Sequence, residues 1–197
     1  GILLSAGRGT RFDPAGVQDK LLQRLPDGDA VAVAAARTLH AVLPEVVAVV
    51  RPGADRAAAA LKEAGCRITI CPDADAGMAA SLVHALSQTP HADGWIVALA
   101  DMPFVAPATV SALMQAIRQG ADIAAPVHAG RRGNPVAFGR RHLTELLQLQ
   151  GDGGARGLLR RHPVQLVEVD DPGIHRDIDT PADLAAQHGS PAATPPQ

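Results

Sequence analysis

The chain has 197 residues, of which 47% are hydrophobic, 19% charged and 2% aromatic, and its formal net charge is −2. This composition suits one globular domain with a single core, and excludes a disordered chain. The scarcity of aromatic rings and of Lys/Arg blocks argues against nucleic-acid partners, and without a signal peptide or an apolar run of about 18 residues we expect a cytoplasmic protein with no membrane partner.

Short apolar runs alternate with alanine-rich segments of helical periodicity along the chain. Strands are expected at 2–5, 45–50, 67–71, 95–100, 122–127, 135–138 and 165–169. Helices are expected at 30–42, 55–64, 78–88, 107–120, 140–149, 155–161 and 181–187. Asp29 is expected to cap the first helix, and Gly65 to end the second.

This order of elements predicts one α/β domain over residues 1–188, with three layers and a mostly parallel sheet covered by helices on both faces. The Ser/Pro/Ala/Thr tail at 189–197 is expected to be disordered. In such sheets, ligands bind beyond the carboxyl ends of the strands. The residues that follow the strands are therefore the first candidates for a functional site.

The segment LSAGRGTR at residues 4–11 follows the first strand. Gly7 and Gly9 allow the backbone to approach an anion closely and to aim N–H groups at it. Arg11 adds a forked cationic donor and Lys20 a compact one. These features predict a loop that binds phosphates.

Two other phosphate motifs do not fit. A P-loop would read G-x-x-x-x-G-K-[ST], which the chain lacks. A dinucleotide fingerprint needs a third glycine where Phe12 stands, and an acid where Arg51 follows the second strand. An NAD(P)-dependent oxidoreductase stays open as a remote alternative, because Arg51 could contact a 2′-phosphate.

Asp101 ends an otherwise apolar strand, where a buried and unpaired carboxylate would be costly. A divalent cation between Asp101 and a triphosphate would remove that cost, and Mg²⁺ commonly takes one or two carboxylates together with phosphate oxygens. The alternative is that Asp101 caps the turn before Pro103. Asp177 and Asp179 lie on one side of an extended segment, so they either close the site or act as caps.

Two residues that follow Asp179 are expected to have structural roles. Thr180 before Pro181 is expected to be a helix N-cap, and Asp183 a first-turn acid that the helix dipole stabilises.

With these motifs in view, LSAGRGTR…KLL resembles the signature L-A-A-G-x-G-x-R-[FM]-G-x-x-K of the MobA-like nucleotidyltransferases, and is most similar to the molybdenum cofactor cytidylyltransferases. LADMP at 99–103 resembles the metal-binding motif of that family, DIDTPADL at 177–184 its C-terminal motif, and GMAASL at 77–82 a third segment. The chain departs from the family in two places: Ser5 replaces the usual alanine, and residues 13–19 lengthen the stretch before Lys20.

The resemblance implies a Rossmann-like fold of the nucleotide-diphospho-sugar transferase type and a set of site residues. Nucleotide binding is implied for Leu4, Ser5, Ala6, Gly7, Gly9, Arg11, Lys20, Gly77 and Ser81, and catalysis for Arg11, Lys20 and Asp101. Metal binding is implied for Asp101 and Asp177. Acceptor binding is implied for Arg132, Asn134, Arg156 and Asp179, although the loops that carry the first three also read as solvated turns.

The activity that the resemblance implies is a Mg²⁺-dependent transfer of CMP from CTP to the phosphate of molybdopterin, with release of pyrophosphate. Ala6, where guanylyl-transferring relatives usually carry glycine, favours CTP over GTP. A molybdoenzyme is the expected recipient of the product. Alternatives are transfer from GTP, transfer to a sugar phosphate or methylerythritol phosphate, and a non-catalytic cofactor chaperone.

Overall fold

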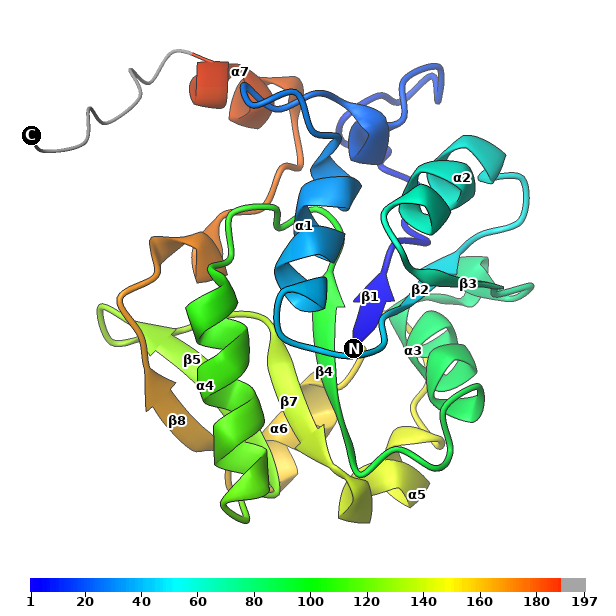
Figure 1. Cartoon of the computed structure of the whole chain (residues 1–197). Coiled ribbons are helices and arrows are strands. Elements are labelled where there is room, and N and C mark those ends of the chain that lie inside the picture. Colours follow the sequence, from blue (N-terminus) through cyan, green and yellow to red (C-terminus); the bar gives the residue numbers. More distant parts are fainter. Residues whose placement is uncertain (189–197) are drawn as a thin grey trace, which may run out of the picture.

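The computed structural model describes residues 1–188, which form one eight-stranded sheet with helices packed on both of its faces (Figure 1). The strands are β1 (Ile2–Leu4), β2 (Val47–Val50), β3 (Arg67–Ile70), β4 (Gly94–Leu99), β5 (Ile123–His128), β6 (Arg131–Arg132), β7 (Val136–Gly139) and β8 (Gln165–Glu168). Their order is β3-β2-β1-β4-β7-β5-β6, and β8 pairs with β5. The three-layer α/β architecture expected from the sequence is confirmed.

The half of the sheet that carries the site is parallel: β1 pairs with both β2 and β4, and β2 pairs with β3. β7 runs antiparallel to β4 and β5. It does so because only a short turn and β6 separate it from β5, and a parallel return would require a longer crossover.

The helices are α1 (Val31–His40), α2 (Asp55–Glu63), α3 (Met78–Ser87), α4 (Pro107–Arg118), α5 (Leu143–Leu146), α6 (Arg156–Arg161) and α7 (Pro181–His188). The 3₁₀ turns are η1 (Lys20–Leu22), η2 (Ala74–Ala76), η3 (Arg140–His142) and η4 (Pro172–His175). None of the helices among residues 1–188 has the length and apolar content needed to cross a bilayer.

Helical periodicity explains which helix covers which face. Buried residues of α1, α2 and α4 join one core cluster with Leu3 and Ala48 of the sheet. Buried residues of α3, α5 and α6 join a second cluster with Ile2 and Val49, on the opposite face. In Figure 1, α1 and α4 lie in front of the sheet and α6 behind it. Both faces of β1 and β2 are therefore covered, as their continuous apolar sequences require.

Two local expectations are wrong. Asp29 does not cap the first helix: the N-cap residue is Ala30, without a side-chain cap, and the Asp29 carboxylate pairs with Arg37 instead. The helix expected at 140–149 is reduced to η3 and the four-residue α5. The chain leaves the helix after Leu146 and reaches the start of α3, where the Gly151 carbonyl accepts a hydrogen bond from the Ala79 amide at 3.1 Å.

The cap of α7 is as expected. The Asp183 carboxylate accepts hydrogen bonds from the amide and the hydroxyl of Thr180 at 2.7 and 2.8 Å, and the Asp183 amide donates to the Thr180 hydroxyl at 3.3 Å. This reciprocal arrangement is a capping box. The tail expected at 189–197 lies outside the described residues.

Candidate active site

A cavity of about 420 Å³ opens at the carboxyl ends of β1 and β4, within the size range of small-molecule sites. Its walls come from the glycine loop after β1, the start of η1, the turn into α3, the end of β4, the loop before α6 and the segment before α7. The lining residues are Leu4, Ser5, Ala6, Gly7, Arg8, Gly9, Thr10, Arg11, Lys20, Leu21, Ala74, Asp75, Gly77, Met78, Ser81, Leu99, Asp101, Asp152 and Asp179. All nine expected nucleotide-binding residues are in this wall.

Ser5 fixes the start of the glycine loop. Its hydroxyl donates to the Val49 carbonyl at 2.6 Å, and its amide donates to the same carbonyl at 3.0 Å. The serine that replaces the alanine usual in related sequences thus adds a second bond between the end of β1 and β2. This attachment holds the loop that follows at the rim of the cavity.

The longer stretch before Lys20 folds onto the carboxylate of Asp13. That carboxylate accepts backbone N–H groups from Ala15, Val17 and Gln18 at 2.9, 2.7 and 2.7 Å. These hydrogen bonds, with Gln18 the largest contributor, hold the pKa of Asp13 below its usual value. Because the added residues form this compact turn, Lys20 still reaches the cavity.

Lys20 bridges two carboxylates across the cavity. Its ammonium Nζ lies 2.7 Å from Asp101 Oδ2 and 3.0 Å from Asp179 Oδ1, and only 10% of its side chain is exposed. Burial alone would lower the pKa of Lys20, but the ion pairs with Asp101 and Asp179 raise it above its usual value. The ammonium is therefore firmly charged and neutralises the two acids.

The segment that carries Asp179 is tied directly to the end of β4. The Ile178 amide donates to the Asp101 carbonyl at 2.9 Å, and the Ile178 side chain is fully buried. Asp179 also pairs with Arg11 at 2.6 Å. The alternation expected for this segment is present, since Ile178 points into the core while Asp179 points into the cavity.

Asp177 is exposed and is not among the residues that line the cavity, but its carboxyl group interacts electrostatically with Asp179 and Asp101. Loss of solvent, and then repulsion from Asp179 and Asp101, raise the pKa of Asp177. Lys20 and Arg11 pair with Asp101 and Asp179, so Asp177 is the acid of the three for which the described residues provide no ion pair. The carboxylates of Asp101, Asp177 and Asp179 are not all within ligand distance of one another. Within residues 1–188, the only three side chains with all ligand atoms within 4.8 Å of one another lie elsewhere.

The turn into α3 is packed against the loop before α6. Gly77 has a φ of 111°, and a Cβ added there would lie 2.5 Å from Asp152 Oδ1 and 2.7 Å from the Gly151 carbonyl. A side chain at this position would therefore push the loop away. Ser81 is buried in the first turns of α3 and faces the same cavity.

Two features of the cavity were missed from the sequence. Arg8 forms a two-pronged ion pair with Asp75, with distances of 2.7 and 2.5 Å, and joins the glycine loop to η2. Asp152 adds a carboxylate to the wall beside Gly77. Neither is signalled by local spacing, because each depends on contacts between residues more than sixty positions apart.

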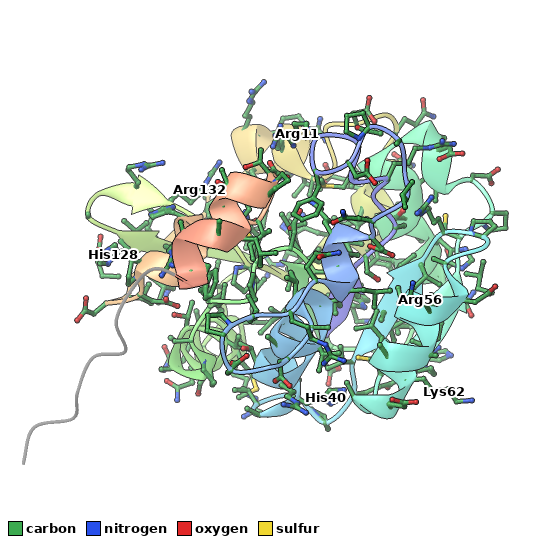
Figure 2. The ribbon with its side chains drawn as sticks, turned by 90° about the horizontal axis from the view of Figure 1, so that it is seen from above. Arg11, His40, Arg56, Lys62, His128 and Arg132 are labelled. Atoms are coloured by element: carbon green, nitrogen blue, oxygen red, sulfur yellow. The ribbon has the colours of Figure 1, made fainter. Side chains whose placement is uncertain are left out.

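The expected acceptor residues are not brought together. Asp179 lines the cavity, but the other three do not. Arg132 is exposed on β6, to the left of Arg11 in Figure 2, and is not part of the cavity wall. Arg156 is exposed at the start of α6. Asn134 is half-buried next to β7, where its backbone N–H donates to the Ile174 carbonyl at 3.1 Å.

Comparison with known proteins shows which family has this fold. The profile of the MobA-like NTP transferase domain matches residues 1–167. No curated protein sequence gives a significant match.

Several solved structures share the fold. Rv0371c from Mycobacterium tuberculosis H37Rv is 30% identical over 96% of this chain and 97% of its own, with a TM-score of 0.83. Its complex with manganese is 28% identical over 94% and 95%, with a TM-score of 0.77. A nucleotidyl transferase from Methanothermobacter thermautotrophicus, Mth528, is 25% identical over 94% and 93%, with a TM-score of 0.76.

Molybdopterin-guanine dinucleotide biosynthesis protein A from Archaeoglobus fulgidus is 21% identical over 94% and 95%, with a TM-score of 0.64, and at that identity the likeness concerns the fold. The match of the domain profile to most of the chain decides the assignment. The chain belongs to the MobA-like NTP transferase family and is a nucleotidyltransferase.

Proposed function

We propose that this enzyme transfers CMP from CTP to the phosphate of a molybdopterin-type acceptor and releases pyrophosphate, with Mg²⁺ as its metal. The observation that carries the proposal is the Lys20 ammonium, held between Asp101 and Asp179 beside the glycine loop, where the Lys20 side chain packs against Gly9. In this proposal a molybdoenzyme takes up the product in the cytoplasm.

The triphosphate would lie against the glycine loop. Gly7 is exposed and has open space where a Cβ would stand, so the backbone there can approach a phosphate closely. Arg11 is 76% exposed at its side chain and can turn from Asp179 toward the triphosphate. Lys20 would neutralise the charge that gathers at the α-phosphate.

The reaction is an in-line displacement. An oxygen of the acceptor phosphate forms a bond to the α-phosphorus of CTP, while the bond from that phosphorus to the α–β bridging oxygen breaks. Pyrophosphate leaves with the electron pair of that bond. No covalent enzyme intermediate is needed, because positioning and charge neutralisation supply most of the catalysis.

The acids at the end of β4 suit a hard divalent cation. Carboxylate oxygens are the ligands that Mg²⁺ prefers, and the raised pKa of Asp177, due to loss of solvent and to Asp179 and Asp101, is typical of carboxylates that share too few cations. Lys20 already stands in for one cation between Asp101 and Asp179. We therefore propose Asp101 and Asp177 as ligands. When bound, Mg²⁺ would neutralise charge on the phosphate oxygens.

Matched variants separate the roles of the two C-terminal acids. Asp177→Asn should raise the Mg²⁺ concentration needed for half-maximal activity. Asp179→Asn should remove the carboxylate paired with Arg11 and leave Lys20 paired with Asp101 alone, and should act mainly on the acceptor. If Asp179→Asn alone weakened Mg²⁺ binding, the two roles would be exchanged.

The preference for CTP rests on Ala6, which is 7% exposed and carries a methyl group in the cavity wall. This side chain leaves less room than glycine would, which favours the smaller pyrimidine. Arg132, Asn134 and Arg156 remain proposed acceptor contacts only if the acceptor extends beyond the cavity.

The test is pyrophosphate release from CTP and from GTP, with molybdopterin and Mg²⁺ present. We expect release from CTP to exceed release from GTP at least tenfold. Faster release from GTP would assign guanylyl transfer instead, and release with sugar phosphates or methylerythritol phosphate, but not with molybdopterin, would reassign the acceptor.

A further inference from the structure

A second cluster of potential ligands lies at the opposite end of the sheet from the cavity. His142 is the last residue of η3, Glu145 belongs to α5, and His162 directly follows α6. η3 follows Gly139, which pairs with Gly94 at the start of β4, whereas the cavity lies beyond the other end of that strand. We call these three residues the His–Glu–His cluster.

The imidazole of His142 is buried without a hydrogen-bond partner. The residue is 5% exposed, and within the described part of the chain neither of its ring nitrogens has a partner. Its ring packs against the edge of the His162 ring, with centroids 4.7 Å apart. A buried polar group without a partner is costly and calls for an explanation, such as an unseen ion.

The three side chains are close to the spacing that one metal ion requires. Their ligand atoms all lie within 4.8 Å of one another. His162 Nε2 lies 2.9 Å from Glu145 Oε2, and His142 Nδ1 lies 3.8 Å from Glu145 Oε1. Ligands at about 2.1 Å from a tetrahedral zinc ion are roughly 3.4 Å apart, so movements on the order of 1 Å would complete the site.

We propose that His142, Glu145 and His162 bind one Zn²⁺ ion, with water in the remaining position. Two imidazoles and one carboxylate form a ligand set that suits zinc. Mg²⁺ prefers oxygen ligands alone, so this site and the acids beside the cavity select different metals.

The charges around the cluster allow an ion to enter. A metal needs the neutral form of His142, and burial, followed by the neighbouring His162, lowers the pKa of this residue in the direction of that form. Arg161 Nη2 lies 3.4 Å from Glu145 Oε2, but the Arg161 side chain is 61% exposed and can turn into solvent. Arg141 also acts on His142, but it pairs with Asp122 at 2.5 Å, and that carboxylate acts on the pKa of His142 in the opposite direction.

Zinc at this position would join the two ends of a loop that reaches the nucleotide cavity. Residues 147–155 connect α5 to α6 and include Asp152, which lines the cavity, and Gly151, which accepts the Ala79 amide. An ion shared by Glu145 and His162 would shorten the span over which this loop can fluctuate. The site would then be a structural clamp, separate from the proposed transfer chemistry.

The experiment is a Zn²⁺ titration of the chelator-treated full chain by calorimetry, without nucleotide and with excess Mg²⁺ to occupy the acids near the cavity. Co²⁺ absorption and the NMR signals of the histidine rings report the ligands directly. Glu145→Gln and His162→Gln change partly exposed ligands, and His91→Gln changes an exposed histidine outside the cluster. Circular dichroism checks that each variant folds.

We expect one Zn²⁺ per chain, shifted ring signals for His142 and His162, and a higher melting temperature with zinc. Glu145→Gln and His162→Gln should each weaken binding at least about tenfold and lose the thermal shift, and His91→Gln should keep both. Equal zinc binding by the parent and both ligand variants would overturn the proposal. Loss of zinc binding in Asp101→Asn would also overturn it, because the ion would then sit at the cavity. If a ligand variant failed to fold, histidine ring signals that zinc does not shift in the parent would overturn it as well.

Discussion

Replacing Lys20 with Met removes the ammonium that joins two sides of the cavity while keeping a side chain of similar length. Asp101 and Asp179 would then face each other with Arg11 as the remaining cation paired to either of them. Their repulsion should destabilise the ligand-free protein. The same change should also slow nucleotidyl transfer, because a donor near the α-phosphate is lost.

The magnitude follows from the two short contacts. At 2.7 and 3.0 Å, each ion pair has a gross Coulomb energy of about 5–6 kcal/mol at an effective dielectric constant of about 20. Much of this is offset by the cost of removing the charges from water, and breaking a buried pair typically costs about 3–5 kcal/mol. Because Asp101 and Asp179 keep side-chain exposures of 23% and 17%, we expect a loss of about 2–3 kcal/mol, or roughly 4–12 °C in melting temperature.

The assay is thermal and urea unfolding of Lys20→Met with and without Mg²⁺. Lys62→Met, which changes an exposed lysine in the last turn of α2 (Figure 2), is the control and should change stability little. Mg²⁺ should restore part of the lost stability, since it can replace the ammonium between the acids. If Lys20→Met were as stable as Lys62→Met, the ammonium would not be neutralising these carboxylates and our reasoning on the site would fail.

Three further changes probe the frame of the site. Gly77→Ala should raise the KM for the nucleotide at least tenfold, because the new Cβ clashes with the neighbouring loop, whereas Gly120→Ala, with a similar φ but open space, should leave KM unchanged; equal KM values in steady-state assays would contradict the predicted clash. Asp183→Asn should lose about 1 kcal/mol at pH 7. Hydrogen bonds from Thr180 hold the pKa of Asp183 below its usual value, so its contribution is present above the usual pKa of an aspartate and fades as the pH falls through the folded-state pKa. Urea unfolding of the parent and the variant at pH 7 and in acid checks this, and a difference that persists in acid would contradict it. Asp171→Ala removes a buried carboxylate that accepts three hydrogen bonds, two of them from the N-cap residue and the first turn of α4, and should cost about 2–4 kcal/mol in urea unfolding; a loss below about 1 kcal/mol would show that these bonds contribute little.

Much of the fold and half of the site could be predicted because the relevant signals are local. β1, β2 and β4 are apolar runs between turn residues, and parallel strands bring their carboxyl ends to one edge. Gly7, Lys20 and Asp101 follow those ends, so their meeting at one cavity is a consequence of topology. The direction of β7 was less evident, since a two-residue β6 gave no sequence signal of its own.

The rest depends on contacts that local patterns do not encode. The loop that leads to Arg156 was expected near the acceptor from the family resemblance, but packing of Gly77 against Gly151 brings it to the nucleotide cavity. Asp29 has the chemistry of an N-cap, but Arg37 offered its carboxylate a competing charged partner. The His–Glu–His cluster was not anticipated either. His162 lies twenty residues after His142 along the chain, and only the packing of α6 brings it back beside His142 and Glu145.

In the proposed enzyme, the glycine loop, its two cations and Asp101 act on the phosphates of one nucleotide through a divalent ion. The most direct measurement is Mg²⁺-dependent pyrophosphate release by Asp101→Ala, compared with the parent at matched folded concentration. We expect a loss of at least about 10²-fold in kcat while the fold is retained. Turnover within a few-fold of the parent, in a folded Asp101→Ala protein, would contradict the claim.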